Sequence, residues 1–157
     1  WYLERVAMIR EVLPGCGITT DVIAGFCSET EEDHQQTLEL FSKVGFDYAY
    51  MFYYSERPGT LAARHYPDDV PLDVKTRRLN EIIALQSELS LKSNQNDIGK
   101  TFRVLVEGPS KKNPEELCGR SGSNKMCVFP GKGHKAGDYV DVKVLSCTSA
   151  TLIGKLA

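Results

Sequence analysis

Residues 51–60 read MFYYSERPGT, a hydrophobic run that passes directly into a polar, turn-forming exit with one arginine. Just before this exit, Tyr50 and Phe52 alternate with Met51 and Tyr53. Successive side chains of a strand point to opposite faces, so one pair is expected to face inward and the other outward. The stretch therefore predicts a strand whose carboxyl end opens into a functional site.

The segments around this strand alternate between strand and helix. Apolar spacing and Pro or Gly stops predict helix, strand, helix, strand and helix in turn over residues 1–13, 17–26, 28–44, 47–54 and 72–93. This alternation is typical of an α/β fold with parallel strands. Two strands cannot close a barrel, so residues 1–96 are expected to be a partial, TIM-like βα barrel.

The helix expected from about residue 28 has two possible capping arrangements. Ser28 has Glu31 three residues later, and Thr30 has Asp33. Either hydroxyl can accept a hydrogen bond from the first turn, and acidic residues there suit the positive end of the helix. Gly45 fits the left-handed position just past the helix end.

The character of the chain changes near residue 96. Short β-rich runs follow at residues 102–107, 125–130, 139–145 and 150–156, separated by clusters of Gly, Pro, Ser and Asn. This pattern is typical of a small antiparallel β-barrel. We therefore expect two domains, at residues 1–96 and 97–157.

Charge is divided unevenly between these two parts. Residues 1–96 hold 9 Lys and Arg against 15 Asp and Glu, a net charge of −6. Residues 97–157 hold 10 against 6, a net charge of +4. A basic surface attracts polyanions, so the second part is the expected partner of a nucleic acid.

The composition, 41% hydrophobic and 25% charged, is that of an ordinary globular protein. No apolar run approaches the roughly 18 residues of a membrane span, so we expect no membrane partner and a cytoplasmic location. Because residue 1 is Trp, we expect the chain to begin inside a longer protein. Five cysteines, at positions 16, 27, 118, 127 and 147, lack cluster or zinc spacing and are expected to be reduced thiols. His34, His65 and His134 are expected at the surface, not as metal ligands.

Gly25 and Glu29 stand at the carboxyl end of the first expected strand, where parallel sheets bind ligands. A glycine lets a ligand approach the backbone, and the helix that follows presents free N–H groups. Simpler roles are also open, with Gly25 making the turn and Glu29 complementing the helix dipole. At the second strand end, Arg57 suits a bidentate grip on a phosphate or carboxylate, or an ion pair with Glu56 or Asp47.

The two strand ends resemble those of the radical SAM tRNA methylthiotransferases of the MiaB type. In that family a strand with the pattern Ile-x-Gly-x-x-x-Glu flanks the adenine and ribose of S-adenosylmethionine, and residues 23–29 match it. The tRNA-modifying members have Arg-Pro-Gly-Thr after Tyr-Ser-x, as in residues 54–60, whereas ribosomal-protein relatives usually have Glu-Glu-Gly-Thr. The residues that the resemblance implies for cofactor binding are Ile23, Gly25, Glu29, Ser55 and Arg57. Those implied near the substrate are Tyr53 and Arg57.

The second part resembles a TRAM domain, a small RNA-binding β-barrel. The resemblance rests on residues 99–101, 106–108, 119–120, 124–129 and 150–154. Cations in loops can meet phosphates, and an aromatic ring can stack on an unpaired base. The expected RNA-binding residues are Lys111, Lys112, Arg120, Lys125, Phe129, Lys132 and Lys135.

A full-length enzyme of this family would methylthiolate C2 of N6-isopentenyladenosine at tRNA position 37. The resemblance implies S-adenosylmethionine and two 4Fe-4S clusters as cofactors, and the tRNA anticodon arm, not DNA, as partner. The cysteine motifs that hold these clusters are absent from the sequence. We therefore expect the missing N-terminal half of the same protein to supply them. This chain by itself is expected to have no metal ligand or catalytic residue, to bind no cluster and to be inactive.

Two alternative functions remain open at this point. A related enzyme that methylthiolates threonylcarbamoyladenosine shares the Arg-Pro-Gly-Thr run, although the TRAM signature favours the isopentenyl substrate. The chain also suits a non-catalytic RNA-binding or ribosome-contacting module, whose binding would depend on salt without preference for the anticodon arm.

Overall fold

The computed structural model describes residues 1–131 and 133–157. The chain divides into two compact units. Unit 1 consists of Trp1–Val6 and Ile18–Leu89, and unit 2 consists of Ala7–Gly17 and Ser90–Ala157.

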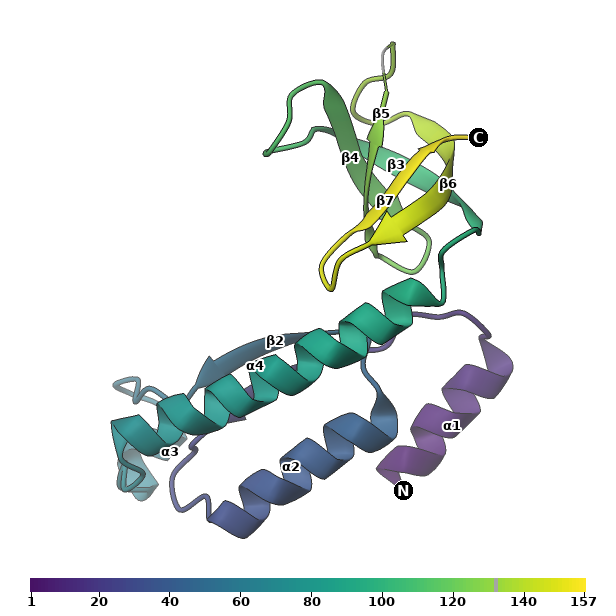
Figure 1. Cartoon of the computed structure of the whole chain (residues 1–157). Helices are drawn as coiled ribbons and strands as arrows, with labels where there is room; N and C mark the ends of the chain where they lie inside the picture. Colours follow the sequence, from purple (N-terminus) through teal and green to yellow (C-terminus); the bar gives the residue numbers. More distant parts are fainter. Residues whose placement is uncertain (132) are drawn as a thin grey trace. The chain divides into compact units, whose positions relative to one another are not determined.

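Strands and helices alternate through the first 95 residues, as the α/β prediction requires. Their bounds are α1 Tyr2–Val12, β1 Thr19–Ala24, α2 Glu31–Val44, β2 Tyr48–Tyr53, α3 Leu61–His65 and α4 Leu72–Gln95 (Figure 1). The short helix α3 was not predicted, because five residues are too few for an apolar periodicity to appear.

Strands β1 and β2 form a parallel two-stranded sheet in which Ile23 pairs with Phe52. One face of the sheet packs on helices α2 and α4, where Phe41, Phe46 and Ile82 are almost completely buried. The opposite face is open to solvent, and Ile23 and Phe52 are 54% and 55% exposed. Tyr50 on the same face is also exposed. The sheet therefore has one packed face and one uncovered face.

Helix α2 uses the second of the two capping arrangements. The Thr30 hydroxyl accepts a hydrogen bond from the Asp33 backbone N–H, and the Asp33 side chain accepts one from the Thr30 N–H. Ser28 instead donates its backbone N–H to Asp69 at 2.7 Å. Gly45 ends the helix in the left-handed conformation, as predicted.

Unit 2 contains a small closed β-barrel (Figure 1). Its strands are β3 Thr101–Pro109, β4 Glu116–Ser121, β5 Met126–Pro130, β6 Tyr139–Cys147 and β7 Leu152–Leu156, in the order β3-β4-β5-β7-β6. The pairing of β5 with β7 is parallel, so the barrel is not purely antiparallel. After the β6–β7 hairpin, β7 closes the barrel against β5, and both strands run in the same direction.

Strand β4 was missed in the sequence because its run, ELCGRS, contains glycine and three polar residues instead of branched side chains. Gly119 of β4 lies against β3, and a Cβ there would overlap the Leu105 carbonyl oxygen. Glycine lets the backbones approach at this point. The barrel interior is filled by large side chains, including Phe129 and Leu152.

The structure agrees with the expectation for the cysteines but not with that for His34. The cysteines are free thiols, and burial raises the pKa of Cys127 to about 11. His34, by contrast, is completely buried and not at the surface. Its Nε2 lies 2.6 Å from a Glu81 carboxylate oxygen, a partner 47 residues away that the sequence does not reveal. Among the described residues, no helix is long and apolar enough to cross a membrane.

Candidate functional site

An open pocket of about 690 Å³ lies in unit 1 at the carboxyl ends of β1 and β2. Parallel strands place their carboxyl ends side by side, which is where ligands bind in α/β sheets. Of the residues predicted from the sequence, the pocket brings together Ile23, Tyr53, Ser55 and Arg57. It also includes Asp21, whose carboxylate stands within an apolar strand.

Arg57 projects from the turn after β2 and is exposed. The turn is fixed by Thr60, whose hydroxyl donates to the Arg57 carbonyl oxygen at 2.9 Å. Asp47 accepts a hydrogen bond from the Ile18 N–H at 2.9 Å. In the described part of the chain, no ion pair joins the Arg57 guanidinium to Glu56 or Asp47. The guanidinium is therefore available to an anionic ligand in the pocket.

Gly25 and Glu29 bind each other and are less accessible than their strand-end position suggested. The Gly25 N–H donates to the Glu29 carboxylate, and Gly25 has the left-handed φ of 70° that favours glycine. A Cβ on Gly25 would overlap the Lys75 side chain. Glu29 also accepts a 3.0 Å hydrogen bond from Arg78. The two residues therefore shape the strand end. The Glu29 carboxylate is already bound by Arg78 and Gly25, and the Lys75 side chain lies against the Gly25 backbone.

A buried lysine holds the second strand end in place. Lys75 Nζ donates to the Tyr54 carbonyl oxygen at 3.3 Å and forms an ion pair with Asp68. The same ammonium lies 5.2 Å from the centroid of the Tyr54 ring, and Phe26 packs edge-on against that ring. Burial raises the pKa of the Tyr54 phenol to about 12, so the ring stays neutral. These contacts fix the backbone from which Ser55 and Arg57 emerge.

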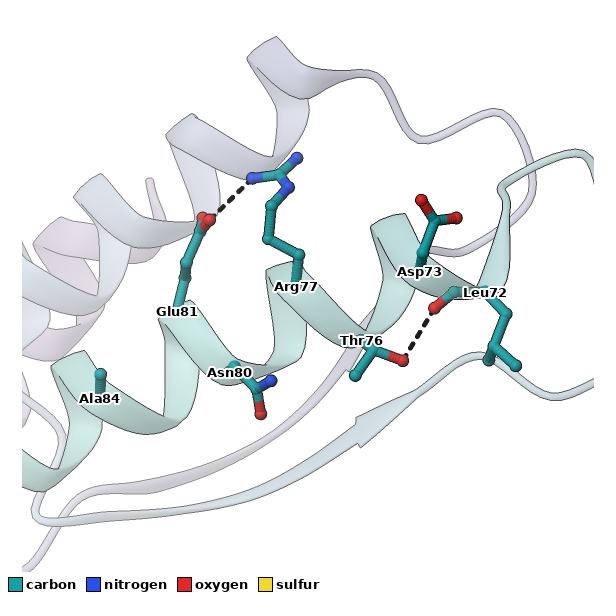
Figure 2. A pocket seen from close by; sticks show the side chains of 7 residues that line it. All are labelled: Leu72, Asp73, Thr76, Arg77, Asn80, Glu81 and Ala84. Carbon is teal, nitrogen blue, oxygen red and sulfur yellow. Dashed lines mark hydrogen bonds and ion pairs between the residues drawn. The ribbon is translucent and has the colours of Figure 1, made fainter.

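A larger pocket of about 980 Å³ lies along one side of α4 (Figure 2). Its lining residues all belong to that helix: Leu72, Asp73, Thr76, Arg77, Asn80, Glu81 and Ala84. In Figure 2, Arg77 and Glu81 turn toward each other, and their side chains meet at 2.7 Å. The Thr76 hydroxyl donates to the Leu72 carbonyl oxygen at 2.8 Å. Because the Thr76, Arg77 and Glu81 side chains already have partners, the strand-end pocket is the better candidate for ligand binding.

Two carboxylates and an imidazole gather between α2 and α4. Ligand atoms of Glu31, His34 and Glu81 lie within 4.8 Å of one another, a spacing that a metal ion would need. The Arg77 guanidinium forms ion pairs with both carboxylates, with N–O distances of 2.6 Å to Glu31 and 2.7 Å to Glu81. Its hydrogen bond lowers the pKa of Glu31 to about 2. The group is therefore an ion-pair network between two helices, in which arginine supplies the positive charge.

The barrel residues expected to bind RNA fall into different environments. Lys111, Lys112 and Lys135 are exposed in loops. Arg120 is partly exposed on β4 and lies 3.3 Å from a Glu107 carboxylate oxygen. Lys132 lies outside the described residues.

Lys125 and Phe129 are placed differently from the expectation. Phe129 is 0% exposed in the barrel core, so its ring has no free face for a base. Lys125 Nζ forms an ion pair of 2.7 Å with Asp97, and both side chains are nearly buried, at 13% and 12% exposure. The same ammonium donates to the Ser93 hydroxyl at 2.8 Å. In β5, Cys127 and Phe129 at alternate positions face inward.

Replacing Lys125 with alanine is expected to lower the free energy of unfolding of unit 2 by about 3 kcal/mol, because the nearly buried Asp97 carboxylate would keep only the exposed Lys100 as a cationic partner. Lys100→Ala is the matched control. Lys100 also pairs with Asp97, at 3.0 Å, but is 57% exposed, so its loss should cost less than about 1 kcal/mol. Urea unfolding followed by circular dichroism measures both changes. An unchanged midpoint for Lys125→Ala, together with weaker RNA binding, would instead make Lys125 an RNA contact.

Sequence reasoning missed the residues that hold the strand ends together. Lys75 and Arg78 lie on α4, where cations normally indicate the solvent side of a helix, yet both side chains are 5% exposed. Arg78 pairs with Glu29, 49 residues away, and Lys75 pairs with Asp68 in the loop before α4, so no helical spacing signals either pair. Asp21 was detectable as a charged residue within a hydrophobic strand.

Comparison with known proteins finds similarity both for the barrel and for the chain as a whole. The TRAM domain family matches residues 95–157. Three relatives bear the name tRNA-2-methylthio-N(6)-dimethylallyladenosine synthase. The protein from Phocaeicola vulgatus is 56% identical over 99% of this chain and 34% of its own length. The protein from Bacteroides thetaiotaomicron is 57% identical over 99% of this chain and 34% of its own length. The protein from Amoebophilus asiaticus is 56% identical over 99% of this chain and 32% of its own length. The chain thus spans about a third of the length of the curated relatives it matches.

Proposed function

We infer that this chain belongs to the tRNA-2-methylthio-N(6)-dimethylallyladenosine synthases and corresponds to a C-terminal region of such an enzyme that includes its TRAM domain. The activity proposed for the whole protein is methylthiolation of C2 of N6-isopentenyladenosine at position 37 of tRNA. The observation that carries the proposal is the match over nearly the entire chain, which includes both strand ends and the barrel. The anticodon arm is the proposed partner, in the cytoplasm where tRNA is found.

The uncovered face of the β1–β2 sheet supports a place within a larger barrel. Ile23, Tyr50 and Phe52 are each more than half exposed, and a stable parallel sheet is normally covered on both faces. The curated relatives have about twice as much additional chain as is present here. We propose that this additional chain supplies the remaining strands of a radical SAM barrel, with the uncovered face directed to its interior.

The strand-end pocket offers groups that suit the proposed cofactor, S-adenosylmethionine. Ile23 offers an exposed apolar surface to an adenine ring, and Arg57 offers a guanidinium to a carboxylate. Ser55 stands beside Arg57 and can donate a hydrogen bond to the same ligand. Gly25 and Glu29 act indirectly, because their contacts with Lys75 and Arg78 fix the strand end. When bound, the cofactor supplies the radical that begins the reaction.

The iron-sulfur clusters of the proposed enzyme do not fit residues of this chain. Its cysteines lack the required spacing, and two of the five, Cys27 and Cys127, are buried. We propose that the cysteines in the additional chain of the relatives hold the clusters. The role of this chain is to bind the cofactor and RNA.

Arg57 provides a test of the proposed function. In a strain that lacks the endogenous enzyme, the full-length gene carrying Arg57→Ala should restore at least tenfold less 2-methylthio-N6-isopentenyladenosine than the wild-type gene, because the cofactor carboxylate loses its bidentate partner. Mass spectrometry of tRNA nucleosides measures the product. Arg64→Ala, an exposed arginine on α3 outside the pocket, is the matched control and should restore wild-type levels. Equal restoration by both variants would contradict the role of Arg57.

A further inference from the structure

The outer surface of the barrel carries several cations around one exposed tyrosine. We propose that this surface binds single-stranded RNA, with the cations on phosphates and the tyrosine ring stacked on a base. The inference rests on the proposed function, since it names the surface through which a tRNA-modifying protein would hold its substrate. We call this surface the basic face; its residues are Arg103, Arg120, Tyr139, Lys143 and Lys155.

Strand register places the first half of the basic face on three adjacent strands. Tyr139 of β6 pairs with Leu105 of β3, and Leu105 pairs on its other side with Arg120 of β4. Arg103 precedes Leu105 by two residues and therefore points to the same side of β3. The intervening Val104 is 0% exposed in the core, so the other side chains face outward. Arg103, Arg120 and Tyr139 thus share one outer surface.

Tyr139 has the geometry of a stacking platform. Its side chain is 59% exposed at the start of β6. The Arg103 guanidinium lies over the ring, 4.8 Å from its centroid. Contact with a guanidinium restrains the ring without burying it, so little rotational freedom is lost when a base stacks on it. Stacking on aromatic rings and arginine planes is how proteins bind unpaired RNA bases.

Two lysines complete the basic face at its other end. Lys143 of β6 pairs directly with Lys155 of β7, and both are exposed. Like charges directly opposite each other destabilise a sheet. In the part of the chain that the structure describes, neither ammonium has a carboxylate within ion-pair distance. Folding does not explain this pair, whereas a bound phosphate would remove the repulsion.

The remaining charges on this surface leave it positive. Asp141 pairs across the strands with Arg103, and Glu107 lies 3.3 Å from Arg120. The four cations of the basic face thus have two neighbouring carboxylates. An acidic protein would satisfy the excess charge as well as a phosphate backbone, but it would not require an exposed ring beside the cations. The ring at Tyr139 favours RNA.

The test measures binding of the 157-residue chain to a fluorescently labelled anticodon stem-loop RNA by anisotropy at several salt concentrations. Tyr139→Leu should weaken binding about tenfold, because it removes one stacked base. Lys143→Gln with Lys155→Gln should make the dependence of log K on log salt less steep by about 1.4, because two phosphate contacts to single-stranded RNA are lost. Tyr2→Leu, and Lys43→Gln with Lys92→Gln, make the same changes at exposed positions elsewhere and should leave binding within about twofold of wild type. Circular dichroism checks that every variant is folded.

The outcomes separate this inference from the proposed function. If the basic-face variants bind like their controls while Lys111→Gln with Lys112→Gln weakens binding, the loops bind RNA and the inference is wrong. If only the lysine variant is impaired and it loses binding to polyglutamate equally, the surface is a general polyanion site and the stacking proposal is wrong. A wild-type chain that binds no RNA would contradict the RNA-binding part of the proposed function as well.

Discussion

Replacing Arg78 with alanine is expected to lower the free energy of unfolding of unit 1 by about 3–5 kcal/mol. Arg78 Nη1 donates to the Glu29 carboxylate at 3.0 Å and to the Glu29 carbonyl oxygen at 2.9 Å. Its Nη2 lies 3.2 Å from Glu31. With side chains 5% and 13% exposed, Arg78 and Glu29 form a nearly buried pair. Removal of the guanidinium would leave the Glu29 carboxylate nearly buried with the Gly25 N–H as a donor but without a positive charge to pair with.

Arg77 is the matched control for this prediction. It neighbours Arg78 on α4 and binds the same Glu31 carboxylate at 2.6 Å, but its side chain is 45% exposed. Arg77→Ala should cost less than about 1 kcal/mol, since exposed pairs contribute little. Hydrogen exchange of the α2 and α4 amides in the 157-residue chain measures both changes. Equal losses for the two variants would contradict the assignment of Arg78 as the structural arginine.

A test within the buried pair separates charge from packing. If the loss in Arg78→Ala comes from the unpaired carboxylate, adding Glu29→Gln should recover part of it, because an amide is cheaper to bury than a carboxylate. If the loss comes from packing, the double variant should be no more stable than Arg78→Ala. The comparison is a double-mutant cycle on contacting residues.

Replacing Gly119 with alanine is expected to lower the free energy of unfolding of the barrel by about 3 kcal/mol, at the upper end for overpacking. A Cβ at this position would overlap the Leu105 carbonyl oxygen and lie 2.8 Å from Val104 Cγ1. The main-chain oxygen cannot rotate away, so β3 and β4 would have to separate. Urea unfolding of unit 2, followed by hydrogen exchange at β3 amides, measures the loss.

Gly122 provides a control three residues away. A Cβ on Gly122 would have no atom within 4 Å, and its φ does not lie in the left-handed region. Gly122→Ala should therefore leave stability within about 0.5 kcal/mol of wild type. If Gly119→Ala were equally harmless, the close approach of β3 to β4 would be wrong.

Features set by neighbouring residues could be predicted from the sequence. The Thr30–Asp33 capping box, the glycine that ends α2 and the strand that ends at Tyr53 each depend on a few adjacent side chains. The α/β alternation followed by a barrel was predictable for the same reason. Ile23 and Arg57 could also be placed at one pocket, because parallel strands end at the same edge of a sheet.

Features set by tertiary contacts could not be predicted in this way. Arg78 and Glu29 are 49 residues apart, and His34 and Glu81 are 47 apart, so no spacing rule connects them. Lys125 is a basic residue in an RNA-binding motif, but the sequence does not show that it forms a nearly buried ion pair with Asp97. The charge of a residue indicates which groups it can bind, whereas its burial depends on the partners that the fold brings next to it.

Nucleoside mass spectrometry of tRNA, from a strain of the source organism in which the gene is deleted, tests the proposed methylthiolation directly. We expect N6-isopentenyladenosine to accumulate and its 2-methylthio derivative to disappear, and the full-length gene to restore the derivative. If the 2-methylthio derivative persists at wild-type levels in the deletion strain, the proposed function is wrong. Loss of the 2-methylthio group from threonylcarbamoyladenosine instead would assign the related enzyme class.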